Sequence, residues 1–466
     1  MHRRSMIALV VATAAVVTSA CASSPSGPAP TTASDPTPTT VSEDVRVVAT
    51  GLDDPYEIVL GPDDFIWVTE KSGKRVVRVN PDSGEKKTAL EIPEAVHTTG
   101  GQDGVLGLAL HPDLLTGRGR DHVYLAHTYR TDAGPRTKIV RYTYDPDGER
   151  LHSPKDLITG MPAGHDHQAA RLVFGPDGKL YYTIGDQGAN QFSLYCEPIR
   201  AQELPTAAQV RAEDWDAYRG KVLRLETDGS IPRDNPELEG VRSHVYSYGH
   251  RNPQGLAFSP DGLLYSSEQG PKTDDEVNVI RAGRNYGWPH IAGYRDDRAY
   301  VYADWSAARG GCASVTYDDY TVPEEVPQEK ETDWTHPDFT PPIRTFYTVD
   351  DGYEFQNPKC GGMDFMCWPT LAPASLEVHP DGKALLMPSL KDGAVYRLRL
   401  AEGGERIVDV APLGKTVNRY RDTTVSRDGR TVYVATDSTG ITRDALGVPT
   451  KTLTHPGAIL AFPYRP

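Results

Sequence analysis

The sequence predicts an all-β fold, a six-bladed β-propeller with long inserted loops. One signature occurs six times: a turn at Pro-Asp or Arg-Asp, often followed by Gly, and then a strand of alternating apolar residues. The composition agrees, because 43 glycines, 38 prolines and 24 tyrosines in 466 residues suit short strands and many turns better than a helical bundle. Each copy spans more residues than a minimal four-stranded blade needs, and long inserted loops account for the difference.

The six copies follow one another along the chain. FGPDGKLYYTIGD and FSPDGLLYSSEQG show the pattern, since Asp-Gly makes a tight turn and alternating apolar residues make a strand. The longest interval, Pro260 to Pro380, predicts an insertion there. A large β-sandwich or a pair of β-domains is the alternative, which six matching units disfavour. The turns begin at Pro62, Pro112, Pro176, Pro260, Pro380 and Arg427.

The N-terminus has the pattern of an exported protein. A positive start, HRR, precedes the apolar run MIALVVATAAVVTSA, so we expect residues 1–20 to be a signal peptide. Cys21 follows small residues as in a bacterial lipobox, with Thr18 where Leu is usual; cleavage near Ala20 without a lipid is the alternative. Residues 21–43 are rich in Pro, Thr and Ser and predict a disordered tether, leaving 44–466 as the propeller domain. We therefore expect a protein at the extracytoplasmic face of the membrane, anchored through Cys21.

Charge, motifs and cysteines narrow the function classes. The net charge of −15 argues against nucleic-acid binding. A Gly-x-Gly-x-x-Gly motif after a strand and a P-loop are both missing, so neither a nicotinamide cofactor nor a nucleotide is indicated. Export permits disulfides. Cys360 and Cys367 close a short loop and are expected to pair, whereas the pairing of Cys196 with Cys312 stays open.

Polar residues stand just before the repeat strands, where propeller loops surround a central channel. In GHDHQ, His167 is a candidate general base and Asp166 a candidate partner for a substrate hydroxyl. A zinc site needs a third ligand that the sequence does not supply, and an exposed polar loop is the simpler reading of this motif alone. Gln102, Arg251 and Asn252 hold the corresponding positions in neighbouring repeats.

Cations and carbonyls suggest further sites. Arg419 and Arg421 alternate with Tyr420, so on a strand their side chains point the same way, and with Lys391 they would form an anion site. The carbonyls of the Gly270-Pro271 turn are candidates for a hard cation. The acidic run at 274–276 is either a calcium site or a solvated turn.

Eight segments, in order, resemble one enzyme family. The soluble glucose dehydrogenases that depend on pyrroloquinoline quinone (PQQ), with their aldose sugar dehydrogenase relatives, are similar over about residue 50 to the end. The family fold is a six-bladed propeller, as the repeats predict. The segments are GQDGVLGLALHPD, DHQAARLVFGPDGKLYYTIGDQGANQ, GKVLRLETDGSIPRDNP, YGHRNPQGLAFSPDG, SEQGPKTDDEVNVIRAGRNYGWPHIAGYRDD, CWPTLAP, PSLKDG and NRYRD.

The resemblance implies a role for each matching residue. His167 would take the proton of the anomeric hydroxyl of an aldose while hydride passes to the quinone, with Asp166, Arg251 and Gln102 beside the sugar or the reacting carbonyl. The cofactor would be bound by Gln102, Gln191, Asn252, Trp368, Thr370, Lys391, Arg419 and Arg421. A calcium ion would sit on the carbonyls of Gly270 and Pro271. A second calcium would use Glu276, Tyr286, Ala292, Tyr294, Asp296 and Glu331. The family also has a disulfide matching Cys360–Cys367.

The chain departs from the family pattern in three places. Phe365 stands where the family has a cofactor-side tyrosine, the segment Asp304–Val326 is dissimilar with Cys312 unmatched, and soluble members lack the tether. The expected function is oxidation of glucose-like aldoses to lactones, with PQQ and Ca²⁺ as cofactors, an external electron acceptor and a homodimeric state. A calcium-dependent lactonase and a non-catalytic sugar-binding propeller are the alternatives.

Overall fold

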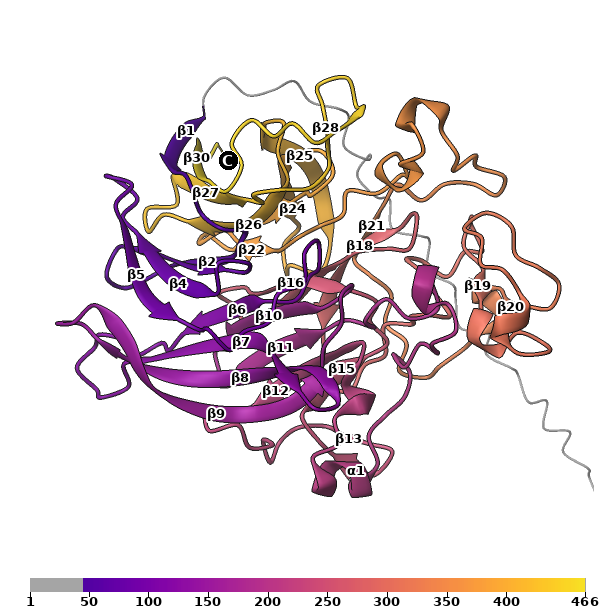
Figure 1. The fold of residues 1–466 in the computed structure, drawn as a ribbon, viewed down its shortest axis with the longest axis horizontal. Coiled ribbons are helices and arrows are strands. Elements are labelled where there is room, and N and C mark those ends of the chain that lie inside the picture. Colours follow the sequence, from indigo (N-terminus) through magenta and orange to yellow (C-terminus); the bar gives the residue numbers. More distant parts are fainter. Residues whose placement is uncertain (1–44, 466) are drawn as a thin grey trace, which may run out of the picture. The chain divides into compact units, whose positions relative to one another are not determined.

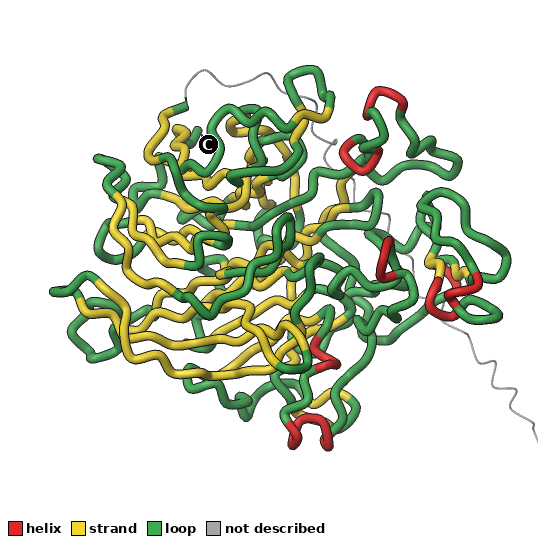
Figure 2. Tube along the Cα trace, in the orientation of Figure 1, coloured by secondary structure: helices red, strands yellow, loops and turns green. Residues whose placement is uncertain are grey.

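The structure is a computed structural model that describes residues 45–465, all of which fall in one compact unit (Figure 1). The expected signal peptide, Cys21 and the tether up to residue 43 lie outside the described residues. Strands dominate the trace, and the helices are single short turns in the loops (Figure 2). Within residues 45–465, no helix is long and apolar enough to cross a membrane.

The predicted six-bladed propeller is confirmed: the described residues form six four-stranded antiparallel sheets. The first three are β2 (Pro55–Leu60), β3 (Ile66–Glu70), β4 (Arg75–Val79) and β5 (Lys86–Glu91); β6 (Val105–Leu110), β7 (His122–Thr131), β8 (Gly134–Asp145) and β9 (Arg150–Pro162); and β10 (Ala169–Phe174), β11 (Leu180–Ile184), β12 (Lys221–Leu225) and β15 (Val245–Tyr248).

The remaining three sheets follow the same order. They are β16 (Pro253–Phe258), β17 (Leu264–Glu268), β18 (Asp275–Ile280) and β21 (Arg344–Phe346); β22 (Glu377–Val378), β23 (Ala384–Pro388), β24 (Ala394–Leu400) and β25 (Ile407–Lys415); and β26 (Tyr420–Val425), β27 (Thr431–Thr436), β30 (Ile459–Pro463) and β1 (Arg46–Ala49). Every repeat turn joins the first two strands of a sheet. The repeat therefore marks the same hairpin in each blade.

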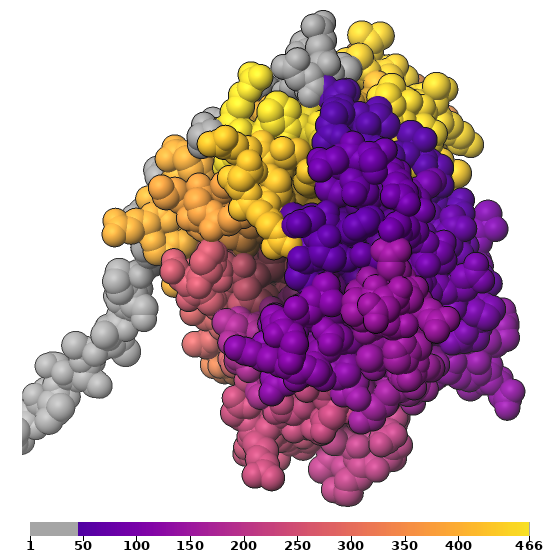
Figure 3. All heavy atoms as spheres, turned by 90° about the vertical axis from the view of Figure 1, so that its left-hand side faces the viewer, coloured from indigo at the N-terminus to yellow at the C-terminus, as the bar shows by residue number. Residues whose placement is uncertain are grey.

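The ring is closed by the first described strand. β1 pairs antiparallel with β30, with Arg46 opposite Ala461 and Val47 opposite Leu460. Figure 3 shows the indigo atoms of the first strands against the yellow atoms of the last. A strand from each end of the chain thus completes the last blade.

The insertion predicted between Pro260 and Pro380 lies between β18 and β21. It contains the strand pair β19 (Tyr302–Ala303) and β20 (Gln328–Glu329) and the 3₁₀ turns η3 (Trp305–Ala307), η4 (Cys312–Ser314) and η5 (Glu331–Asp333). The other small elements are α1 (Ala207–Ala212), β13 (Glu237–Leu238), β14 (Val241–Arg242), β28 (Thr442–Arg443), β29 (Pro449–Thr450), η1 (Phe192–Leu194), η2 (Asp216–Tyr218), η6 (Pro358–Cys360) and η7 (Asp364–Met366).

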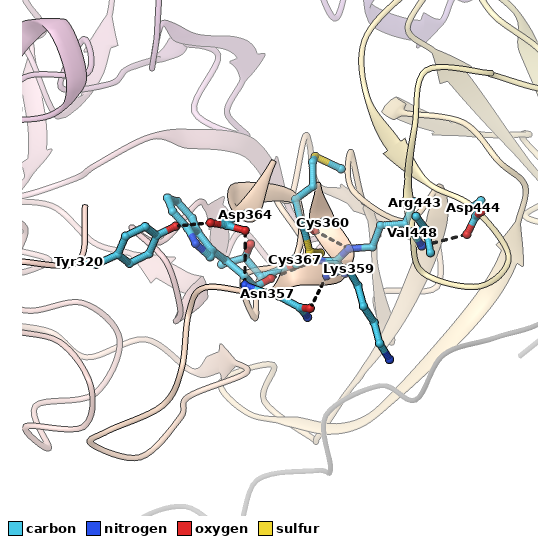
Figure 4. Close-up of a disulfide and its surroundings, with 12 residues drawn as sticks. Tyr320, Asn357, Lys359, Cys360, Asp364, Cys367, Arg443, Asp444 and Val448 are labelled. Atoms are coloured by element: carbon cyan, nitrogen blue, oxygen red, sulfur yellow. Dashed lines mark hydrogen bonds between the residues drawn. A yellow bond between two sulfur atoms is a disulfide. The ribbon is translucent and has the colours of Figure 1, made fainter. Parts of the chain in front are cut away.

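Both disulfides form. Cys360 pairs with Cys367 as predicted, and the second bridge joins Cys196 to Cys312 across 116 residues. Figure 4 shows the first bridge with Arg443 of β28 beside it, where Arg443 Nε donates to the carbonyl of Met366 at 2.7 Å. This contact fixes the Cys360–Cys367 loop to the last blade.

The apolar core lies between neighbouring sheets. The first strands of the six sheets, which contact one another, are the inner strands (β2, β6, β10, β16, β22 and β26), and several of them carry buried charged side chains. Apolar side chains of β6, β7, β10, β11 and β12 form one such layer. Arg171 of β10 is buried among inner strands, with Nη1 3.0 Å from Glu57 Oε1 and 3.1 Å from Asp422 Oδ2. Arg171 also donates to the carbonyls of Gln254 and Ala374, so one guanidinium joins groups from five blades.

Candidate active site

A cavity of about 510 Å³ lies where the loops before the inner strands converge. Its wall includes residues from loops next to strands of all six sheets and from the insertion after β18. Most of the residues predicted from the sequence line this one cavity: Gln102, Asp166, His167, Gln191, Arg251, Gly270, Pro271, Trp368, Thr370, Lys391, Arg419 and Arg421.

His167 is held by an aspartate that the sequence analysis missed. Its Nδ1 lies 2.6 Å from Asp186 Oδ1, and both side chains are buried, with exposed fractions of 5% and 1%. Asp186 also accepts hydrogen bonds from the Gly188 N–H and the Trp288 indole N–H, each at 2.9 Å. An ionised Asp186 can only accept, so the proton of a neutral imidazole stays on Nδ1. Nε2 then carries the lone pair, which in this structure faces the Gln191 amide nitrogen.

The backbone before β10 is shaped to present His167 to the cavity. His167, Ala169 and Ala170 all have positive φ, at 42°, 51° and 79°, which residues other than glycine rarely adopt. A Cβ at position 185 would lie 2.0 Å from the carbonyl oxygen of His167, so only glycine fits there. Such strain persists where surrounding contacts hold it, and it concentrates at functional sites.

A polar network connects His167 to the next blade. Gln191 Nε2 lies 3.3 Å from His167 Nε2, while Gln191 Oε1 accepts from Arg251 Nη2 at 3.3 Å. Arg251 Nη1 donates to the Gln269 carbonyl at 3.1 Å, and the buried Arg251 Nε has no hydrogen-bond partner within residues 45–465. A buried unpaired donor is costly, so a ligand oxygen in the cavity would stabilise it.

Asp166 and Gln102 lie on the other side of His167. Asp166 Oδ2 lies 3.8 Å from His167 Nε2, and Asp166 Oδ1 accepts from the His167 backbone N–H at 2.9 Å and from the Gln102 amide. The Gln102 backbone N–H donates to the carbonyl of His165 at 2.9 Å. The backbone carbonyl of His165 thus positions Gln102.

Cations gather at the far end of the cavity, but their charge is partly neutralised. Arg421 donates to both carboxylate oxygens of Asp437 at 2.8 Å, and Arg419 Nε donates to Asp437 Oδ2 at 2.9 Å. Although burial opposes ionisation, the two guanidinium groups lower the pKa of Asp437 well below its usual value. Lys71, which the sequence analysis did not select, adds another ammonium to this wall.

Lys391 is a buried amine that forms no ion pair within residues 45–465. Its exposed fraction is 7%, and its Nζ contacts Thr370 Oγ1. Burial, together with the nearby Arg443, lowers the pKa of Lys391 to about 7, despite the attraction of Asp275. The indole N–H of Trp368, in the same wall, is buried without a hydrogen-bond partner within the described chain. Unpaired donors and excess positive charge fit a ligand that carries carboxylates.

Asn252 is the one predicted cofactor-side residue that does not line the cavity. It is fully buried behind the wall, where its Nδ2 donates to Gln269 Oε1 at 3.1 Å and its Oδ1 accepts from Gln254 at 2.9 Å. Its side-chain oxygen and nitrogen each already have a protein partner.

The turn at Gly270-Pro271 presents backbone to the cavity. Asp275 fixes this turn by accepting from the Gly270 N–H at 2.9 Å and from the N–H groups of Leu371 and Ala372. In the described part of the chain, no group of three or more His, Cys, Asp or Glu side chains is arranged to hold a metal ion. A cation at this turn would therefore depend on carbonyl oxygens and on oxygens of the bound ligand, which suit calcium.

The residues of the second predicted calcium site lie around the loop at 291–297, outside the cavity. Glu276 accepts from the Gly293 N–H at 2.6 Å, and Glu331 accepts from the N–H groups of Ala292 at 3.0 Å and Asp296 at 3.2 Å. Burial raises the pKa of Glu331 to about 7 and raises those of Glu276 and Asp296.

Two tyrosines complete that predicted set. The hydroxyl of Tyr294 is buried without a hydrogen-bond partner in residues 45–465. The hydroxyl of Tyr286 donates to the Val279 carbonyl at 2.6 Å and accepts from the Arg281 N–H at 2.9 Å, so it is already paired. The acids of the set are the buried Glu276 and Glu331 and the exposed Asp296, and their oxygens are largely bonded to backbone N–H groups.

Comparisons with known proteins agree with this arrangement. The model of the glucose/sorbosone dehydrogenase family matches residues 52–317. Quinoprotein glucose dehydrogenase B of Acinetobacter calcoaceticus is 44% identical over 438 residues, covering 91% of each chain. Aldose sugar dehydrogenase YliI of Escherichia coli is 30% identical over 53% of this chain and 61% of its own.

Solved structures show the same fold. The PQQ-bound aldose sugar dehydrogenase of Streptomyces coelicolor superposes with a TM-score of 0.62 at 24% identity, over 90% of this chain and 97% of that one. A putative oxidoreductase (glucose dehydrogenase) of Thermus thermophilus gives a TM-score of 0.62 at 27% identity, over 90% and 98%.

Proposed function

Because the chain belongs to the glucose/sorbosone dehydrogenase family, we propose that it is a quinoprotein that oxidises glucose-like aldoses to lactones with PQQ and calcium. The single observation that carries this proposal is the buried His167–Asp186 pair, which faces a cavity with cationic groups at its far end. A base and an anion site within one cavity match the needs of a sugar oxidation.

The proposed role of His167 is to accept a proton. The anomeric hydroxyl of the sugar would replace the Gln191 amide at Nε2, and the proton would pass to that nitrogen. Asp186 would stabilise the resulting imidazolium through the hydrogen bond at Nδ1. Asp166 and Gln102, on the other side of Nε2, would hold further sugar hydroxyls, and Arg251 would bind an oxygen of the cofactor or substrate through its unpaired Nε.

When bound, PQQ supplies a two-electron acceptor for the hydride from the anomeric carbon. Lys391, Arg419, Arg421 and the Trp368 indole N–H would hold its carboxylates and carbonyls, with Thr370 and Gln191 beside them. Asn252 is proposed to act behind this wall by orienting Gln269. The carbonyls of Gly270 and Pro271 would hold a calcium ion, and the oxidised sugar would leave as a lactone while an external acceptor takes the electrons.

The second calcium belongs to the same proposal. Glu276 and Glu331 are buried and Asp296 lies at the surface beside them; the pKa of each is raised, and a divalent cation would compensate their charge. The unpaired Tyr294 hydroxyl and the backbone at Ala292 and Tyr286 complete this proposed set.

The proposed location follows from the N-terminal sequence alone. Residues 1–20 would act as a signal peptide, Cys21 would carry the lipid, and residues 21–43 would tether the catalytic domain at 44–466 to the extracytoplasmic face of the membrane. A homodimer is part of the expectation from the family.

Reconstitution tests the proposal. Purified apo-protein receives PQQ and calcium, and then a panel of aldoses with a redox dye. We expect dye reduction that requires both additions. Hydrolysis of lactones without dye reduction would favour the lactonase alternative, and quinone-independent sugar binding without turnover would favour the non-catalytic one.

A further inference from the structure

The insertion after β18 forms one wall of the cavity. We call residues 302–329, from the start of β19 to the end of β20, the aromatic insertion. Five of its residues line the cavity: Tyr302, Ala303, Trp305, Tyr317 and Asp319. Most of it is the segment Asp304–Val326, which does not match the family motifs.

The aromatic insertion is fastened to a second loop, residues 189–196, which follows β11. The Cys196–Cys312 disulfide joins the two covalently. Asn190 adds hydrogen bonds on both sides of its amide: Nδ2 donates to the Ala303 carbonyl at 2.8 Å, and Oδ1 accepts from the Trp305 N–H at 2.8 Å.

Aromatic rings fill the space between these two segments. The Trp305 and Tyr317 ring centroids lie 4.9 Å apart, and Phe192 and Tyr195 each lie 5.9 Å from Tyr317. The Tyr195 hydroxyl also donates to the Val315 carbonyl at 3.3 Å. Ring packing, hydrogen bonds and the disulfide therefore all hold the loop at 189–196 against the aromatic insertion.

That loop carries Gln191, which contacts the base. Asn190 and Phe192, on either side of Gln191, have φ values of 62° and 47°. A bulky residue such as Phe rarely adopts this conformation unless surrounding contacts impose it. The contacts with the aromatic insertion are therefore what hold Gln191 within 3.3 Å of both His167 Nε2 and Arg251 Nη2.

We propose that the Cys196–Cys312 disulfide is a positioning element of the sugar site. It fixes the loop at 189–196 so that Gln191 orients the His167–Arg251 pair, and it fixes the aromatic insertion as the wall against which the sugar packs. This inference rests on the proposed sugar oxidation. Lys391, Arg419 and Arg421 at the far end of the cavity come from other blades, so this disulfide can affect cofactor binding only through Gln191, and we expect that effect to be small.

The test compares three variants with the wild type, all loaded with PQQ and calcium. Cys196→Ser/Cys312→Ser removes the bridge. Asn190→Gly keeps the bridge and tolerates the positive φ but loses the amide contacts. Ser314→Ala is the matched control, because Ser314 lies in η4 beside Cys312, is exposed and does not line the cavity. The measurements are KM and kcat for glucose, the PQQ dissociation constant from absorbance titration, and proteolytic cleavage within 302–329.

We expect the double variant to lose about 10–100-fold in kcat/KM, mainly through KM, because misplacing a positioning group by about 1 Å has effects of that size. Its PQQ dissociation constant stays within twofold of the wild-type value, and cleavage within the aromatic insertion becomes faster. Asn190→Gly changes KM in the same direction by a smaller factor, and Ser314→Ala changes nothing.

An unchanged KM in a folded double variant would overturn the inference, and so would a parallel loss of PQQ binding, which would indicate general damage. If the double variant does not fold, folded wild-type protein treated with a thiol reductant decides: an unchanged KM after the Cys196–Cys312 bridge has been reduced overturns the inference. Failure of the proposed function is seen separately, as no sugar oxidation by the loaded wild type.

Discussion

His167 Nδ1 and Asp186 Oδ1 lie 2.6 Å apart in a buried pair that joins the loop before β10 to the residue two positions after β11. The two residues belong to the same hairpin, so the blade itself sets their distance. With Nδ1 committed to Asp186, the lone pair of Nε2 is directed at the cavity. This geometry is the main support for the proposal that His167 is the general base.

Asp186→Asn should reverse the tautomer of His167. An amide N–H in place of the carboxylate would face Nδ1 and favour the proton on Nε2, which removes the basic lone pair. We expect kcat to fall by about 10²–10⁴-fold, with His167→Ala giving a loss of similar size. Steady-state kinetics of the PQQ-loaded variants checks this, and near-normal turnover in either loaded variant would remove the base assignment.

Lys391→Met should weaken cofactor binding. A charge-assisted hydrogen bond to a carboxylate contributes about 1.5–3 kcal/mol, so the PQQ dissociation constant is expected to rise by about 10–100-fold. Equilibrium titration of PQQ absorbance measures this directly. Arg118→Met is a suitable control, because Arg118 is exposed and distant in sequence from every cavity-lining segment.

The same lysine predicts a pH dependence of PQQ binding. The pKa of Lys391 in the empty site is about 7, and a bound carboxylate favours the ammonium form and raises it. Above pH 7 binding must therefore take up a proton, so affinity should fall as the pH rises. Calorimetry at pH 8 in buffers of different ionisation enthalpy should detect this uptake in the wild type and find it reduced in Lys391→Met; equal uptake in both proteins would contradict the assignment.

Calcium should stabilise the apo-protein through the acids around the loop at 291–297. Glu331 has a pKa raised to about 7 by burial, and calcium competes with its proton, so calcium affinity should fall as the pH drops through 7. Saturation at about 100 times the dissociation constant would add about 2.7 kcal/mol to the free energy of unfolding. Glu331→Gln should lose most of the calcium-induced rise in Tm; a full rise in that variant would rule out this site.

Arg171→Met should destabilise the propeller at its centre. The change leaves Glu57 and Asp422 buried without their cation, and breaking a buried ion pair costs about 3–5 kcal/mol. Urea unfolding should show this loss, while Arg118→Met, which breaks an exposed pair with Asp113, should cost less than about 1 kcal/mol. Equal costs in the two variants would mean that the central charges are not coupled.

The fold was predictable because its signal is local and repeated. An Asp-Gly turn followed by alternating apolar residues specifies a hairpin whatever the rest of the chain does, and six hairpins at the same place in six sheets specify the propeller. Closure by β1 against β30 was not predictable in the same way, since it pairs the two ends of the described chain and has no local signature.

Polar residues that precede a repeat strand, such as His167 and Arg251, could be selected from the repeat pattern, and the structure places them at the cavity. Gln191, Trp368 and Thr370 were selected only through the family resemblance, and Asp186, a partner from another part of the blade, was missed. Asp186 had a usable signal, because an acid stands at or just after the end of the second strand in several repeats. It follows the strand in TIGD and VATD (Asp186 and Asp437) and ends it in VTE and SSE (Glu70 and Glu268). The pairing of Asp437 with Arg419 and Arg421 belongs to the same pattern. Asn252 was predicted to contact the cofactor but does not line the cavity. The sequence pattern does not distinguish a residue whose side chain lines a cavity from a neighbour buried behind it.

The most direct test of the central claim follows the anomeric hydrogen of the sugar. Apo-protein loaded with PQQ and calcium is given glucose, unlabelled or deuterated at C1, and the products and electrons are counted. We expect one lactone for each two electrons delivered to the dye and slower turnover of the deuterated sugar. In His167→Ala we expect neither lactone formation nor dye reduction. Retention of bound PQQ with no lactone from glucose or from any other aldose would contradict it.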